Sequence, residues 1–130
     1  MATILGIDWG QKRVGVARAD TTARLSEPLV TLAYTTTDEL IDKLQKLAID
    51  YQAQTVVVGV PRNLDGEYTQ QSQAIEAFIS RLDKILDCQV VRFDETLSSA
   101  AGEDIKTQYS NSDRDSRAAA VILQDYLDSM

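Results

Sequence analysis

Acidic residues at three places in the sequence have the type and the setting for metal-dependent chemistry. Asp8 ends a short apolar run and is followed two residues later by Gly10. Asp94 and Glu95 end another apolar run, and Asp115 begins a helical stripe. Because neighbouring residues of a strand point to opposite faces, we expect Glu95 rather than Asp94 to face Asp8. Three converging carboxylates suit Mg²⁺ or Mn²⁺, and a pair of such ions activates water for phosphodiester hydrolysis.

Two of these acids also have a purely structural interpretation. A turn aspartate that bonds to its own backbone is the alternative for Asp8. Asp115 lies three positions before Ala118 and four before Ala119, which places it on the inward stripe of its helix. A buried carboxylate there needs a cation, a metal or a helix N-terminus. First-turn placement alone would suit the helix dipole by about 0.3–1 kcal/mol, which is the structural alternative for Asp115.

Composition excludes several other kinds of chemistry. The 130 residues contain no histidine and one cysteine, so a disulfide framework, a zinc site of the usual ligands and a Ser-His or Cys-His nucleophile are excluded. The net charge of −7 argues against a protein that coats nucleic acid. Basic residues nevertheless stand beside the motifs and predict a local basic rim, formed by Lys12, Arg13, Arg62, Arg114 and Arg117.

The apolar pattern predicts one α/β domain over residues 1–130. Five strands are expected near residues 3–7, 14–19, 25–32, 55–60 and 89–93. Pro28 removes a backbone donor, which places the third strand at a sheet edge. Helices are expected from a capping box of Thr36 and Glu39 to residue 51, over 75–86, from Ser98 or Ser99 to about 109, and over 118–126. No apolar run is long enough to span a bilayer and no signal-type segment is present, so we expect a cytoplasmic protein without a membrane partner.

Four spaced motifs together resemble the YqgF family, and the resemblance covers nearly the whole chain. They are Gly6-x-Asp8-x-Gly10-x-Lys12-Arg13-x-Gly15-x-Ala17, Val58-Gly59-Val60-Pro61 with Asn63 and Asp65-Gly66, Asp94-Glu95 with Leu97, and Asp115-x-x-Ala118-Ala119 with Ile122-Leu123-Gln124. The resemblance implies an RNase H-like fold: a five-stranded mixed sheet whose first three strands are antiparallel, with helices on both faces.

The resemblance also implies a function. It is that of a metal-dependent endonuclease, either in 5′-end processing of precursor 16S ribosomal RNA or as a Holliday-junction resolvase acting on branched DNA. Asp8, Glu95 and Asp115 would be its catalytic, Mg²⁺- or Mn²⁺-binding acids. Nucleic acid would meet the residues Lys12, Arg13, Arg62, Asn63, Arg114 and Arg117. No motif bears on oligomeric state.

The chain departs from the family pattern at two places. Thr96 stands where the family usually has an arginine, and Ser98-Ser99 stands where it has paired threonines. Losing a cation affects phosphate affinity more than the metal ligands. Two rival interpretations remain: the phosphate-binding hairpin of sugar kinases and chaperone ATPases, which needs a second domain, and a non-catalytic domain of the same fold that binds RNA or protein.

Overall fold

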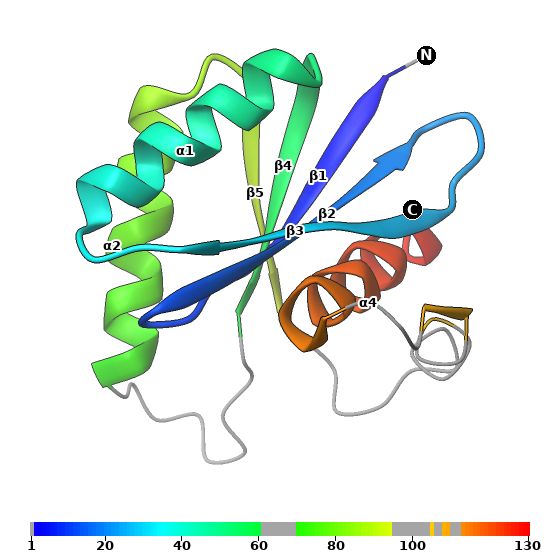
Figure 1. The fold of residues 1–130 in the computed structure, drawn as a ribbon. Coiled ribbons are helices and arrows are strands. Elements are labelled where there is room, and N and C mark those ends of the chain that lie inside the picture. Colours follow the sequence, from blue (N-terminus) through cyan, green and yellow to red (C-terminus); the bar gives the residue numbers. More distant parts are fainter. Residues whose placement is uncertain (1, 61–69, 95–104, 106–107, 110–112) are drawn as a thin grey trace.

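The computed structural model describes residues 2–60, 70–94, 105, 108–109 and 113–130. Its centre is a five-stranded sheet of order β3-β2-β1-β4-β5. The strands β1 (Thr3–Asp8), β2 (Arg13–Asp20) and β3 (Ser26–Ala33) are antiparallel neighbours. The strands β4 (Ala53–Val60) and β5 (Gln89–Asp94) extend the sheet from β1 in parallel. The predicted mixed sheet is therefore confirmed (Figure 1).

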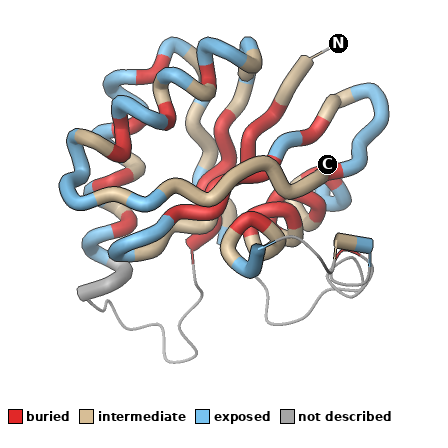
Figure 2. The backbone as a smooth tube through the Cα atoms, in the orientation of Figure 1, coloured by how far each residue is buried: buried red, intermediate tan, exposed pale blue. Residues whose placement is uncertain are grey.

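Helices cover both faces of this sheet, as predicted (Figure 1). On one face lie α1 (Thr37–Asp50) and α2 (Gln70–Ile85), which close a core containing Leu40, Leu44 and Phe78. On the other face α4 (Arg114–Asp128) closes a second core through Ala119 and Leu123. Figure 2 shows the buried residues running along the sheet between these two layers. No helix in the described ranges is long and apolar enough to cross a membrane.

The interior strand β4 is buried on both sides. Its residues Val56 to Val60 are all buried, and they alternate between the two cores, with Val57 on the α4 side and Val58 on the α1 and α2 side. A continuous β-branched run is the pattern of such a strand, because neither face has contact with water. The expectation of a parallel β4-α2-β5 unit is also confirmed.

The third strand forms one edge of the sheet, as Pro28 predicts. Val16 pairs with Val30 and Ala17 pairs with Pro28, so one extra residue, Leu29, bulges out of β3 at this point. A proline and a bulge both disfavour pairing with a further strand, which protects an edge from unwanted association.

The start of α1 differs slightly from the predicted capping box. The Thr36 side chain accepts a bond from the Glu39 amide at 3.2 Å, as an N-cap does. The Glu39 carboxylate accepts from the Thr35 hydroxyl at 2.9 Å and pairs with Lys43 at 3.1 Å. In a capping box the Glu39 carboxylate would accept a bond from the backbone amide of Thr36. Here it bonds to Thr35, one residue earlier, and pairs with Lys43. The helix expected from Ser98 or Ser99 to about 109 lies mostly outside the described residues.

Candidate active site

Asp8 lies on the face of the sheet that α4 covers. Along β1, Ile7 packs into the core beneath α1 and α2. Gly6 faces the other way, because a Cβ added to it would lie 2.7 Å from the Cβ of Leu123 on α4. Asp8 is two residues beyond Gly6 and therefore points to the same side. It is half-buried at the end of its strand.

Asp115, in the first turn of α4, lies near the same end of β1. We call this region, formed by Asp8, Gly15 and Asp115, the acidic corner. Asp8 pairs with Gly15 on the neighbouring strand. A Cβ added to Gly15 would lie 1.9 Å from the Asp115 carbonyl oxygen and 2.9 Å from the Ser116 amide nitrogen. The first turn of α4 thus lies directly on the residue that pairs with Asp8. In Figure 1 the end of β1 and the orange start of α4 lie at the same end of the sheet. The structure therefore packs the turn that carries Asp115 against the strand position next to Asp8.

The position of this first turn is fixed by Asp113, a residue that was not among the candidate site residues. Asp113 is the N-cap of α4 and accepts a bond from the Ser116 amide at 3.0 Å. The Thr31 hydroxyl on β3 donates to the same carboxylate. These bonds lower the pKa of Asp113, because they favour its charged form. An aspartate two residues before an inward-facing acid is a cap signal that the sequence offered.

Arg13 forms an ion pair with Asp115. Its Nε lies 3.3 Å from the Asp115 Oδ2, and the side chains are 67% and 27% exposed respectively. An ion pair this open to water contributes little to stability, on the order of 0–1 kcal/mol. Sequence analysis placed Arg13 on the basic rim without foreseeing this partner. The pair shows that a cation is accommodated next to Asp115.

Asp94 points away from this corner. Its carboxylate lies 3.5 Å from the Nε of Arg92, and the Nη2 of Arg92 lies 3.0 Å from the Glu76 carboxylate on α2. Phe93, between Arg92 and Asp94, packs into the core on the α4 side. Asp94 therefore belongs to the α2 face, in keeping with the expectation that only one acid of the Asp94-Glu95 pair faces Asp8. Glu95 itself lies outside the described residues, as do Arg62, Asn63, Thr96, Ser98 and Ser99.

This geometry can be compared with known proteins. A family model described as RuvX, a Holliday junction resolvase, matches residues 2–129. The chain belongs to the RuvX family. This is the YqgF family that the motifs resembled, so that identification is confirmed, and with it the prediction of a nuclease family.

Relatives of this RuvX chain are similar over their whole length. A protein of Chloroflexus aggregans named "Putative pre-16S rRNA nuclease" is 38% identical, over 98% of this chain and 94% of its own. A protein of Trichormus variabilis with the same name is 35% identical, over 95% and 86%.

Solved structures confirm the RNase H-like fold. RuvC of T. thermophilus, solved with a Holliday junction substrate, has a TM-score of 0.68 at 12% identity, over 99% of this chain and 95% of its own. The fowlpox virus Holliday junction resolvase has a TM-score of 0.61 at 17% identity, over 98% and 99%. At these identities the likeness is one of fold.

The basic residues of the RuvX chain surround the corner unequally. Lys12 and Arg114 are exposed, and Arg13 faces Asp115. Arg117 is half-buried, and its Nε is fully buried without a hydrogen-bond partner among the described residues. Lys12, Arg13 and Arg114 are therefore the described cations of the basic rim that are open to solvent.

The glycine of the first turn is required by the turn itself. A Cβ added to Gly10 would lie 2.5 Å from the carbonyl oxygen of Arg13. The chain folds back on itself between the two residues and leaves no room for a side chain at position 10.

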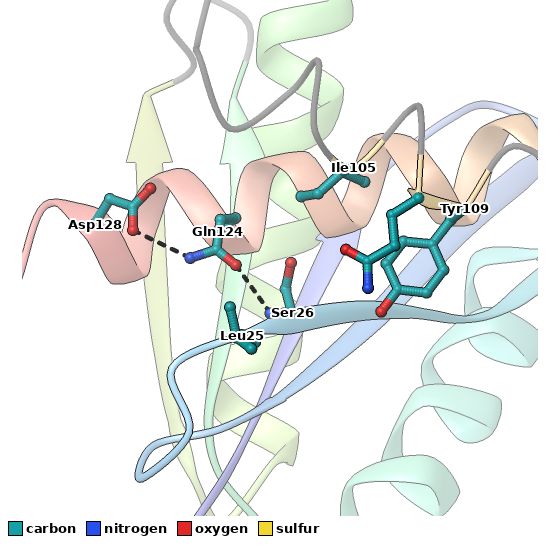
Figure 3. A pocket seen from close by; sticks show the side chains of 7 residues that line it. Leu25, Ser26, Ile105, Tyr109, Gln124 and Asp128 are labelled. Carbon is teal, nitrogen blue, oxygen red and sulfur yellow. Dashed lines mark hydrogen bonds between the residues drawn. The ribbon is translucent and has the colours of Figure 1, made fainter.

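The far half of α4 is anchored to β3, which keeps the helix in place along its whole length. Gln124 accepts from the Ser26 amide at 3.0 Å and donates to Asp128 at 3.1 Å (Figure 3). The Ser26 hydroxyl donates to the Ala120 carbonyl at 2.6 Å. A cavity of about 430 Å³ opens beside these groups, lined also by Leu25 and Tyr109. It adjoins the half of α4 away from Asp115 and is separate from the acidic corner.

The donor set at the corner fits a hard divalent cation. Asp8 and Asp115 offer carboxylate oxygens from two rigid elements, and Arg13 already places positive charge beside one of them. The chain has no histidine, and Cys88 precedes β5 at the opposite end of the sheet. No group of three metal-ligating side chains occurs within the described part of the chain, since the third predicted ligand, Glu95, lies outside it. Oxygen donors alone suit Mg²⁺ or Mn²⁺.

Proposed function

We propose that this RuvX chain is a metal-dependent endonuclease that hydrolyses phosphodiester bonds in the 5′ leader of precursor 16S ribosomal RNA. The observation that carries the proposal is the packing of the first turn of α4, which carries Asp115, on Gly15, the residue that pairs with Asp8. Residues 1–130 act as a single nuclease domain in the cytoplasm, with nucleic acid as partner. The family membership and the names of the relatives support the substrate class.

Each acid has a defined part in this proposal. Asp8, Asp115 and Glu95 would hold Mg²⁺ or Mn²⁺, and such an ion supplies an activated water and stabilises the leaving oxygen. Asp8 and Asp115 come from the end of a strand and the first turn of a capped helix, so the main chain that carries each acid belongs to a regular element. The N-terminus of α4 adds the positive end of a helix dipole to the same corner, which favours a phosphate there.

The basic residues bind and orient the polyanion. Lys12 and Arg114 are exposed, and the largely exposed Arg13 pairs with Asp115. A bound phosphate would draw Arg13 from Asp115, since both compete for one guanidinium. Arg62, Asn63 and Arg117 complete the proposed contact set.

Branched DNA is the second candidate substrate. It is favoured by the description of the family as a Holliday junction resolvase. The likeness to RuvC supports the fold and adds nothing on the substrate. Ribosomal RNA takes precedence because the relatives that are similar over their full length, at 35–38% identity, are named for it.

One assay tests both candidates. Purified protein with Mg²⁺ is given a 5′-extended 16S precursor fragment and, separately, a four-way DNA junction. We expect site-specific cleavage of the RNA that Asp8→Asn and Asp115→Asn abolish while binding persists. Asp125→Asn, the same change of charge on the same helix, is the matched control and should cleave normally.

The possible results separate the candidates. Cleavage of the junction alone would replace RNA with DNA as the substrate. Binding without cleavage of either substrate by the wild-type protein would make the chain a non-catalytic domain.

A further inference from the structure

Tyr34, which directly follows β3, makes two hydrogen bonds to the turn between β1 and β2. Its backbone amide donates to the Lys12 carbonyl at 3.2 Å. Its hydroxyl reaches the Gly10 carbonyl and donates to it. One residue therefore bonds to the turn at two carbonyls, two residues apart, from the main chain and from the side chain.

This turn carries the groups on which the proposed function depends. Asp8 comes immediately before it, Lys12 is exposed within it, and Arg13, which pairs with Asp115 at 3.3 Å, begins the next strand. Four residues, 9–12, separate β1 from β2, so any movement of the turn moves these charges relative to the acids.

Tyr34 is itself held firmly from the side of α1. The Lys43 amine donates to the Ala33 carbonyl at 2.8 Å and pairs with Glu39 at 3.1 Å. Glu39 in turn accepts from the Thr35 hydroxyl at 2.9 Å. The residues on both sides of Tyr34 are therefore fixed to the first turns of α1, and Tyr34 transfers that rigidity to the turn.

We propose that Tyr34 is a positioning residue, whose hydroxyl holds the 9–12 turn in the conformation that presents Lys12 and Arg13 to the substrate phosphates. This inference rests on the proposed nuclease function. Tyr34 touches no reacting group and acts through Gly10. Partial burial raises the pKa of its hydroxyl, so the group remains a neutral donor throughout the physiological range.

A built-in probe reports on the turn. Trp9 is the single tryptophan of the chain and packs on Phe78 of α2, with ring centroids 6.4 Å apart. Its fluorescence, and its quenching by acrylamide, therefore measure the mobility of the turn without any label. This measurement is independent of catalysis and of any metal.

The test is Tyr34→Phe, which keeps the ring and removes the bond to Gly10. We expect acrylamide quenching of Trp9 to increase, and the KM for the RNA substrate to rise about fivefold, the effect of one net hydrogen bond. The kcat should change less than about twofold, since the acids remain in place. Tyr51→Phe is the control: it removes a hydroxyl near Arg18, at the other end of β2, and should change neither quantity.

The outcomes separate this inference from the proposed function. Unchanged Trp9 quenching together with an unchanged KM in Tyr34→Phe would overturn the role of Tyr34. A fivefold fall in kcat at constant KM would also overturn it, because Tyr34 would then act on the acids. If the wild-type protein bound no nucleic acid, the proposed function would fail, whereas the quenching experiment would still decide whether Tyr34 holds the turn.

Discussion

A methyl group at position 15 should separate the two acids without changing either of them. A Cβ at Gly15 would lie 1.9 Å from the carbonyl oxygen of Asp115 and 2.3 Å from its carbonyl carbon. Since Cβ atoms in real proteins keep at least 3.0 Å from such atoms, the first turn of α4 must recede by at least 1.1 Å. Both contacts are with backbone, so no change of rotamer relieves them.

The cost of Gly15→Ala has two parts. Overpacking a tight interface costs about 1–3 kcal/mol, which at about 4 °C per kcal/mol for a domain of this length lowers the melting temperature by roughly 4–12 °C. Displacing a ligand of the centre by about 1 Å lowers the cleavage rate on the order of a hundredfold. The loss of activity should therefore persist at temperatures at which the variant is fully folded.

Gly6→Ala provides the matched control. Its Cβ would meet the Cβ of Leu123 at 2.7 Å, so α4 needs to recede by only about 0.3 Å, and at a point eight residues beyond Asp115. We expect a lower melting temperature with a nearly normal rate of cleavage. Thermal melts and cleavage rates at 20 °C check both variants. A Gly15→Ala protein that melts within about 2 °C of wild type and cleaves normally would refute the placement of α4.

Two further substitutions test the cap and the acids. Asp113→Ala should cost about 1 kcal/mol of stability at neutral pH. Bonds from Ser116 and Thr31 lower the pKa of Asp113. This contribution is therefore fully present above the unfolded pKa of about 3.9 and is lost as the pH falls through the lower pKa of the folded state, so the melting temperatures of variant and wild type should converge as the pH is lowered past both pKa values. Asp8→Asn should melt at the same or a higher temperature than wild type in chelator, because crowded carboxylates repel one another. Magnesium at about ten times its dissociation constant should stabilise wild type by roughly 1.4 kcal/mol and the variant by less, and a wild-type midpoint indifferent to magnesium would contradict the metal site.

The sheet could be predicted because its signals are local. Pro28 marks an edge wherever the rest of the chain lies, and the run from Val56 to Val60, which is valine at every position except Gly59, indicates burial on both faces. The cap at Thr36 was equally visible, since it depends on residues three positions apart. The carboxylate of Glu39 turned to Thr35 instead, because Lys43, one helical turn further on, also attracts it.

The contacts of the site were hidden because they join distant parts of the chain. Arg13 meets Asp115, and Thr31 meets Asp113, although more than eighty residues separate the members of each pair. Neither pair can be predicted from a periodic pattern in the sequence. Charged and hydroxyl side chains are also so common that residue type alone does not identify which two will be partners. Tyr34 gave no signal either, since its hydroxyl bonds to a main-chain carbonyl, a group that every residue possesses.

The spacing of the first motif nevertheless has a physical origin, which is the packing of α4 on β1 and β2. Gly6 and Asp8 lie on one face of β1, two positions apart, and Gly15 lies opposite Asp8. On α4, Asp115 and Leu123 lie eight residues apart on one helical face, and they rest on Gly15 and Gly6 respectively. Only glycine permits such close packing at both points. Gly6 and Gly15 of the first motif are thus the surface on which α4 packs, and that packing places the turn of Asp115 beside the end of β1.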